Sequence, residues 1–339
     1  MINRAVAAVV GLGLVLSVAG CVTTGHASSL AHRMAVKHLP RGPFTVYVLN
    51  QGSGTVTPIS TATNTAGKPI KVGHSPCSIA IAPDGREVYV ANQMAGTVTP
   101  IDTRTNRAGK PIKVGFMASL IRLTPDGNTA YVATANTVVP FNTVTGLVGK
   151  AIRVAPRGDM GAITGMTTTP DGKTVYVATW LGTVIPISTR INRTGKPIHN
   201  RRIMALTGEN LIRITPDGKT AYVSTANAVV PIDTATNTVG GPIRFRQDPF
   251  NMAITPDGKT AYILLTLSGV TAVNTATNQV RKQIAVGKHP AGIAITPDGK
   301  TAYVANRASG TVTVIETRTN VVEKTVKVGK GPWDVLVAR

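Results

Sequence analysis

Residues 289–329 decide the fold of this chain, and they read HPAGIAITPDGKTAYVANRASGTVTVIETRTNVVEKTVKVG. The apolar run at residues 290–296 is typical of a strand that is buried on both faces. The turn Thr296-Pro297-Asp298-Gly299 follows, in which proline presets φ and glycine closes a type I turn. Further strand patterns, separated by turns, lie at Thr301–Asn306, Thr311–Glu316 and residues 322–328. The stretch predicts one antiparallel sheet of four strands.

Variants of this stretch recur along the chain. One such sheet cannot bury both of its faces alone, so the copies are expected to stack on one another. The tyrosine of the second strand is a convenient marker of each copy. It recurs at intervals of 42, 42, 45, 46, 40 and 41 residues, at Tyr47, Tyr89, Tyr131, Tyr176, Tyr222, Tyr262 and Tyr303. Seven four-stranded sheets fit a β-propeller, so the chain is predicted to be all-β, with seven antiparallel blades.

The two ends of the chain predict that the propeller is a closed ring. The first copy begins at its second strand, Thr45–Asn50, with no Pro-Asp-Gly turn before it. The chain ends on Pro332–Ala338, which matches the first strand of a copy. We therefore expect the C-terminal strand to complete blade 1 and to leave no open sheet edge.

The copies resemble the YVTN-family β-propeller repeat, which is named for a motif similar to Tyr89-Val90-Ala91-Asn92 and Tyr303-Val304-Ala305-Asn306. The chain is similar to bacterial YncE-like and surface-layer-type propeller proteins, from Thr45 to Arg339. This resemblance implies the propeller fold. It implies little about function, because such folds carry different functions in different proteins.

The N-terminal residues 1–20 are typical of a secretory signal, with Arg4 followed by an apolar run at residues 5–16. They end in Val18-Ala19-Gly20-Cys21, which resembles the bacterial lipobox. That resemblance implies a lipid on Cys21, which would anchor the chain at the extracytoplasmic face of the cell membrane. The alternative is ordinary secretion. Residues 21–40 are expected to be a flexible tether, and residues 41–339 to form the propeller.

No cofactor or metal site is expected. If Cys21 carries lipid, Cys77 has no disulfide partner, and we interpret it as a small buried residue. Three histidines of the tether are six residues apart, a spacing that does not place them on one helix face for a metal: His26, His32 and His38.

Arg122 and Arg213 are the sharpest candidates for a site. They occupy first-strand positions where three other copies have Ala80, Ala253 and Ala294. An arginine on an innermost strand is costly to bury unless something satisfies its charge. Either each arginine points into the channel and binds an anion, or it pairs with an acid such as Asp159 or Glu209.

Further candidates fall on the connections between one blade and the next, together with two insertions of five residues. Function on rigid scaffolds tends to lie in such loops, so we expect a ligand site at this channel mouth. The ordinary alternative is a set of surface loop charges of little consequence. Besides the two arginines, the predicted ligand-binding residues are Asp159, Glu209, Asp248, His289, Trp333 and Asp334, with Phe116, Trp180 and Phe250 nearby.

The chain is strongly basic, with 36 Lys and Arg against 15 Asp and Glu. Much of this charge lies in the fourth-strand segments, so the outer rim is expected to be basic. It could be a plain solvated surface, could bind anionic lipid headgroups or an envelope polymer, or could bind DNA as some YncE-like relatives do. DNA ranks below envelope polyanions, because an exported protein meets those first.

The sequence as a whole favours a monomeric, non-catalytic binding module at the cell envelope, for an anionic ligand or polymer or a protein partner. The alternative is an enzyme with its site at the channel mouth, similar to propeller lactonases or lyases. No paired carboxylates stand out for such chemistry.

Overall fold

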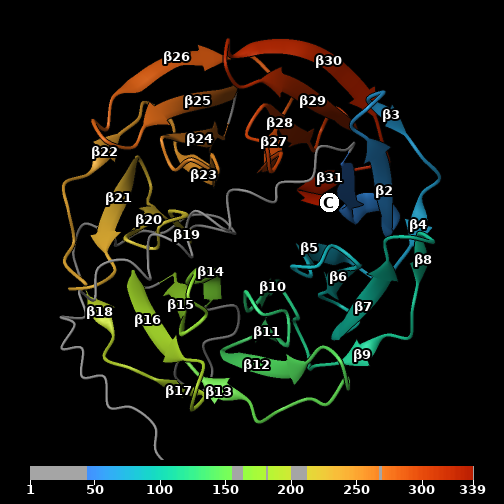
Figure 1. Cartoon of the computed structure of the whole chain (residues 1–339), viewed down its shortest axis with the longest axis vertical. Helices are drawn as coiled ribbons and strands as arrows, with labels where there is room; N and C mark the ends of the chain where they lie inside the picture. The colour runs from blue at the N-terminus through green and yellow to red at the C-terminus, as the bar shows by residue number, and fades with distance from the viewer. Residues whose placement is uncertain (1–43, 155–162, 181, 200–211, 267–268, 339) are drawn as a thin grey trace, which may run out of the picture. The chain divides into compact units, whose positions relative to one another are not determined.

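The computed structural model describes residues 44–154, 163–180, 182–199, 212–266 and 269–338. Seven antiparallel sheets are arranged as a ring of blades (Figure 1). This confirms the predicted seven-bladed propeller. The expected signal, Cys21 and the tether lie outside the described residues.

The strands of each blade are ordered from the centre of the ring outward. For blades 1 to 7 the inner strands are β31 (Pro332–Ala338), β5 (Pro76–Ile81), β10 (Leu120–Leu123), β14 (Ile163–Thr168), β19 (Ile212–Ile214), β23 (Pro249–Ile254) and β27 (Pro290–Ile295). The second strands are β1 (Thr45–Asn50), β6 (Glu87–Asn92), β11 (Thr129–Thr134), β15 (Thr174–Thr179), β20 (Thr220–Ser224), β24 (Thr260–Leu265) and β28 (Thr301–Asn306). The third strands are β2 (Thr55–Ser60), β7 (Thr97–Asp102), β12 (Thr137–Asn142), β16 (Thr183–Ser188), β21 (Ala228–Asp233), β25 (Gly269–Asn274) and β29 (Thr311–Glu316).

The fourth strand is complete in two blades only, β26 (Val280–Ile284) of blade 6 and β30 (Val321–Lys327) of blade 7. In blades 1 to 5 it is reduced to pairs of residues: β3 (Thr65–Ala66), β4 (Ile70–Lys71), β8 (Arg107–Ala108), β9 (Ile112–Lys113), β13 (Ile152–Arg153), β17 (Arg193–Thr194), β18 (Ile198–His199) and β22 (Ile243–Arg244). One short 3₁₀ turn, η1 (Gln51–Ser53), follows β1.

A proline in the third strand explains these interruptions. Proline has no N–H, so it cannot donate to an outer neighbour. The outer segment of blade 1 makes a single bond there, from the Gly67 N–H to the Pro58 carbonyl at 2.7 Å. Blades 6 and 7 have Ala272 and Val314 at this position, and their outer strands are continuous. Blades 1 to 5 have Pro58, Pro100, Pro140, Pro186 and Pro231.

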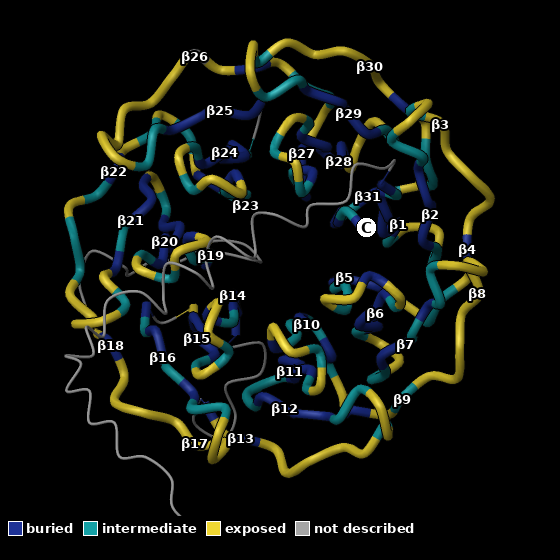
Figure 2. The backbone as a smooth tube through the Cα atoms, in the orientation of Figure 1, coloured by how far each residue is buried: buried dark blue, intermediate teal, exposed yellow. Residues whose placement is uncertain are grey.

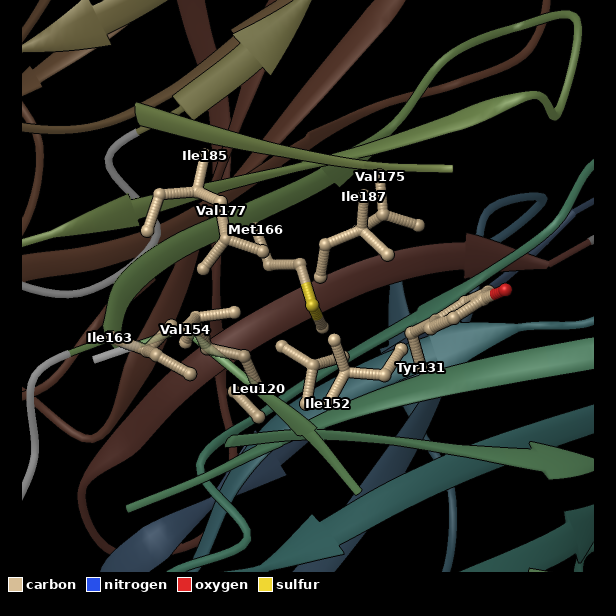
Figure 3. Close-up of a cluster of buried hydrophobic side chains, with 12 residues drawn as sticks. Leu120, Tyr131, Ile152, Val154, Ile163, Met166, Val175, Val177, Ile185 and Ile187 are labelled. Carbon is tan, nitrogen blue, oxygen red and sulfur yellow. The ribbon is translucent and has the colours of Figure 1, made fainter. Parts of the chain in front are cut away.

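The hydrophobic core lies between the blades rather than within one sheet. Figure 3 shows the interface of blades 3 and 4, where Leu120, Tyr131 and Ile152 face Met166 and Val175. Each of the seven interfaces has such a cluster of buried side chains. Every blade therefore depends on both of its neighbours, because burial of apolar surface is the main stabilising contribution.

The ring closes as the chain ends predict. Strand β31 pairs antiparallel with β1, from Thr45 opposite Ala338 to Asn50 opposite Pro332. In Figure 1 the C-terminal strand lies beside the first strands of the chain. The last strand also adds Val335 and Leu336 to the two cores that flank blade 1.

Blade tyrosines bond neighbouring blades together at the outer edge of these cores. Tyr131 Oη of blade 3 donates to Asn192 Oδ1 of blade 4 at 2.7 Å. The asparagine precedes the outer strand in a left-handed turn, with φ of 51° at Asn192, a conformation that asparagine tolerates well. The same contact joins Tyr47 to Asn106, Tyr176 to Asn237, Tyr262 to Asn320, and Tyr303 to Asn64 across the closure.

Blade 2 replaces this bond with a different one. Its Tyr89 would meet the turn of blade 3, but Gly146 takes the place of the asparagine there, with φ of 70°. Tyr89 Oη donates instead to Glu87 Oε2, at 2.5 Å. The other blades have threonine at the position of Glu87. The unusual glutamate therefore compensates for the lost acceptor.

Removing the closing strand should destabilise every blade. We expect deletion of residues 333–339 to lower the melting temperature by at least about 10 °C, because it exposes the edge of β1 and opens two cores. Scanning calorimetry would measure this, with deletion of Arg339 alone as the control. A truncated chain that melts with the full one would contradict ring closure.

The exchange of acceptors at Tyr89 can be tested by a mutant cycle. Glu87→Thr should lower the free energy of unfolding by about 1–3 kcal/mol, because the hydroxyl loses its acceptor. Gly146→Asn should restore most of that loss in the Glu87→Thr chain and little in the wild type. No atom lies within 4 Å of a Cβ at residue 146, so the side chain has room. Denaturant unfolding of the four chains would measure the coupling, and strict additivity would contradict the account.

Candidate functional site

The inner strands surround the centre of the ring (Figure 1), and their register shows which residues are equivalent. Arg122 and Arg213 lie opposite the blade tyrosines Tyr131 and Tyr222. Asp334 lies two positions before the residue opposite the tyrosine of blade 1. Ser78 and Asn251 occupy the position of Asp334 in blades 2 and 6, so all these polar groups lie on two neighbouring levels of the ring.

Each arginine reaches from its own blade to a neighbouring one. Arg122 Nη1 donates to the Ile121 carbonyl at 2.6 Å and lies 3.5 Å from Ser78 Oγ of blade 2. Arg213 donates to the Ile212 carbonyl at 3.1 Å and to Asn251 Oδ1 of blade 6 at 3.2 Å. Both side chains remain partly exposed. Their direction toward neighbouring blades is fixed, while part of each stays accessible.

Asn251 is itself held in place on β23. Its Nδ2 donates to the Ala291 carbonyl of blade 7 at 3.0 Å, and its Oδ1 accepts from the Met252 N–H at 2.8 Å. The amide is buried, so these bonds fix which way it points. Its oxygen therefore faces Arg213, and one amide connects blades 5, 6 and 7.

Asp334 brings a negative charge to the two arginines. Its side chain is buried, and its carboxylate accepts from the Val335 N–H at 2.9 Å and from the Ile79 N–H. Burial raises the pKa of Asp334, and the charges of Arg122 and Arg213 oppose that rise. Desolvation is the larger of the two effects, so the pKa of this carboxyl group stays above its ordinary value.

The pKa values of the two arginines depend on the same two effects. Burial lowers the pKa of Arg122, and the Asp334 carboxylate counters this effect. Burial lowers the pKa of Arg213 to about 9, with a further contribution from the charge of Arg122 and an opposing one from Asp334. A guanidinium group keeps its proton in proteins, so both side chains are cations. The cluster of Arg122, Arg213, Asp334, Asn251 and Ser78, called the central cluster below, therefore combines two cations with one carboxyl group.

An aromatic group adjoins the central cluster. The rings of Phe250 and Trp333 meet edge to face at 5.9 Å, from blades 6 and 1. They can touch across blade 7 because the equivalent residue there is Ala291. Arg307 lies over the Trp333 ring at 4.5 Å, within the range of a cation–π contact.

Of the other predicted residues, those that the structure describes do not join the central cluster. Asp248 and His289 are exposed on the connections. The His289 carbonyl accepts from the Arg307 N–H at 2.9 Å. Phe116 and Trp180 are exposed as well. Asp159 and Glu209 lie outside the described residues, so the pairing with either acid is not tested. The charge of Asp334 acts on both arginines.

Ser78 and Asn251 were not among the predicted site residues. A small polar residue on an inner strand does not stand out from the repeat, although a comparison of each copy at the level of Asp334 would have shown both. Cys77, the neighbour of Ser78, is buried, with Sγ at 3.2 Å from the Ser119 carbonyl and 3.3 Å from that of Ala118.

Within the described part of the chain, no group of three or more His, Cys, Asp and Glu side chains could hold a metal ion. No helix in this described part has the length and apolarity that a membrane span requires.

The sequence matches a family model of YNCE-like beta-propellers over residues 4–179 and 260–338. The chain belongs to this family.

The YNCE-like match leaves out residues 180–259, which include blade 5. Arg122 and Asp334 lie in the matched segments, whereas Arg213 and Asn251 lie between them. The central cluster therefore combines residues from both.

Solved structures show how widely this fold is used. The chain is similar to hydrazine synthase of Kuenenia stuttgartiensis, with 26% identity and a TM-score of 0.70 over 80% of this chain and 92% of that one. It is similar in fold to a candidate 6-phosphogluconolactonase of Bacteroides fragilis, with 18% identity and a TM-score of 0.71 over 88% and 99% of the two chains. A protein of unknown function from Desulfotomaculum acetoxidans matches over the same shares, with 17% identity and a TM-score of 0.72. No protein with a curated description matches the sequence.

The coupling of charges in the central cluster predicts how its variants will behave. Asp334→Ala should lower the free energy of unfolding by about 1–3 kcal/mol, because the bond from the Val335 N–H is lost and the charges of Arg122 and Arg213 lose an opposing charge. The same change should cost much less in a chain with Arg122→Leu and Arg213→Leu. Asp84→Ala, which removes an exposed ion pair with Arg86, serves as the control. Equal losses from Asp334→Ala in both chains would contradict the coupling.

Proposed function

We propose that this propeller is a non-catalytic binding module that holds a small anionic ligand at the centre of its ring. The observation that carries the proposal is the central cluster, in which the guanidinium groups of Arg122 and Arg213 come from two inner strands and are oriented by bonds to Ile121, Ile212 and Asn251. An anion bound there would lie beside two guanidinium groups, which favour negatively charged oxygens as hydrogen-bond acceptors.

The chemistry of arginine supports an oxyanion as the ligand. A guanidinium presents several donors in a flat fork that matches carboxylate and phosphate groups. Here two forks come from blades 3 and 5, and each is partly exposed. One fork bonds to Ile121 and the other to Ile212 and Asn251, so little conformational freedom remains to be lost on binding.

The charge of the whole chain would assist the encounter. A formal charge of +21 attracts anions over roughly the Debye length, which is about 8 Å at physiological salt. This attraction raises the association rate more than it selects a ligand. Selectivity would come from the central cluster.

We place this module at the cell envelope, on the resemblance of residues 1–20 and Cys21 to a secretory signal with a lipobox. A lipid on Cys21 would hold the ring near the membrane that the signal directs it to. An extracytoplasmic module there would meet anionic metabolites and envelope polymers before it met DNA.

A second candidate function is an enzyme with Asp334 as its acid. A carboxyl group shielded from water, with its pKa raised and two cations beside it, is an arrangement found at catalytic sites. The similar fold of a candidate lactonase agrees with this alternative but shows only the fold. Loss of lactone hydrolysis with retained ligand binding in Asp334→Asn would favour the enzyme.

Calorimetric titration with a matched series of ligands would test the binding function. The series is 6-phosphogluconate, gluconate and glucose, which share a carbon chain and differ in charge. We expect affinity to fall in that order, and Arg122→Leu with Arg213→Leu to weaken 6-phosphogluconate binding by at least about tenfold.

The rim provides the control for this titration. Lys68→Gln and Lys110→Gln remove exposed charges from blades 1 and 2 and should leave the affinity unchanged at physiological salt. Equal affinity in the wild type and the double-arginine variant would contradict binding at the centre. Weaker ligand binding in the rim variant instead would indicate that the ligand binds at the rim.

A further inference from the structure

Four apolar side chains are strongly exposed on neighbouring turns of blades 3 and 4. Val144 is 81% exposed and Leu147 72% exposed, on the turn that follows β12. Val148 beside them is 43% exposed, and Ile191, on the turn after β16, is 53% exposed. Large exposed apolar side chains on neighbouring turns are a feature of interaction surfaces.

The fold does not require apolar residues at these turns. The position of Val144 is alanine or arginine in the other blades, namely Ala62, Arg104, Arg190, Ala235, Ala276 and Arg318. The position of Ile191 is threonine in the others, namely Thr63, Thr105, Thr145, Thr236, Thr277 and Thr319. The repeat therefore accommodates alanine, arginine or threonine at the positions of Val144 and Ile191.

A basic groove runs beside these side chains. It is lined by Lys150 and Arg153 of blade 3 and by Ile191 and Arg193 of blade 4, and no acidic residue is among its described lining. Strands β13 and β17 border it side by side, and Figure 2 shows the chain in the exposed colour there. Leu147 and Val148 directly precede Gly149, another residue of the groove. Apolar and basic groups thus form one surface, called the blade 3–4 patch below.

The nearest carboxylates on these turns are already engaged. Asp126, beside the blade 3 turn, accepts from Thr124 Oγ1 and from the Asn128 N–H. Asp171, beside the blade 4 turn, lies 3.6 Å from Lys173 Nζ and accepts from Thr169 Oγ1. These bonds hold the two carboxylates within their own turns, while the described lining of the groove contributes Lys150, Arg153 and Arg193.

We propose that the blade 3–4 patch docks onto the surface of an anionic lipid bilayer. Valine, leucine and isoleucine on protruding turns would enter the boundary between headgroups and acyl chains, and the lysine and arginines would lie against anionic headgroups. The charge complementarity of the patch to such headgroups is the reason for choosing a bilayer rather than a protein as its occupant.

The position of the patch leaves the other end of the ring open. The turn of Val144 contacts the first turn of its own blade, through Thr143 N–H and the Asn128 carbonyl at 3.1 Å. The connections between blades lie at the opposite end of the strands, where Gln93 N–H bonds to the Ser75 carbonyl. A docked propeller would keep its connection face, with Phe250 and Trp333, away from the membrane. This inference stands independently of the proposed ligand at the centre.

Vesicle sedimentation would test the proposal with a chain that begins at Val22, so that neither the expected signal nor a lipid on Cys21 contributes. The ring of this chain is complete in itself, because β31 pairs with β1 and all seven cores lie within residues 44–338. The vesicles are phosphatidylcholine alone or mixed with phosphatidylglycerol. We expect binding to the mixed vesicles, and at least a tenfold lower partition coefficient for a chain with Val144→Thr, Leu147→Thr and Ile191→Thr.

A matched control is available on blade 7, where Val321 and Val322 are 58% and 38% exposed on the outer strand. Val321→Thr with Val322→Thr should leave partitioning unchanged. Lys150→Gln with Arg193→Gln should weaken binding to the mixed vesicles. The proposal is overturned if the wild type binds neither kind of vesicle, or if the apolar variant binds as well as the wild type. It is also overturned if these variants change self-association in sedimentation velocity and leave lipid binding unchanged.

Discussion

The structure depends on one constraint, which is that each four-stranded sheet has two apolar faces and can cover neither by itself. A closed ring of seven sheets covers all of them, with one core at each interface. The blade tyrosines reinforce this arrangement, since each buries its ring in a core and bonds its hydroxyl to the next blade or, at Tyr89, to Glu87. Each blade is therefore stabilised by both of its neighbours, and the contacts that hold the ring together lie outside its centre.

The stabilising cores lie between the blades, so the strands near the centre of the ring can differ from one blade to the next. Blades 7, 1 and 2 are alike: their second strands end on a buried asparagine that presses against a glycine of the preceding connection, as Asn92 does against Gly73. A side chain on that glycine would come within 2.5 Å of the amide, and the other pairs are Asn306 with Gly287 and Asn50 with Gly329. Blades 3 to 6 end these strands differently. Arg122, Arg213 and Asn251 all come from this varied part of the ring.

The repeat made most of the fold predictable, because seven copies could be compared position by position. The same comparison isolated Arg122 and Arg213 among alanines. It placed Asp334 among the ligand-binding residues but did not link its charge to the two arginines, since Asp334 belongs to a blade remote in sequence and spacing gives no distance across a ring. The broken outer strands were missed although five third-strand prolines signalled them, because the prediction was built on blade 7, which has Val314 there.

The most direct test of an anion site at the centre is a crystal structure of the chain grown with selenate, located by the anomalous scattering of selenium. The account predicts a selenate ion within hydrogen-bonding distance of the guanidinium groups of both Arg122 and Arg213, on the side away from Asp334. It would be contradicted by a well-ordered centre that contains no selenate, with the ion bound only to rim lysines such as Lys68 and Lys110.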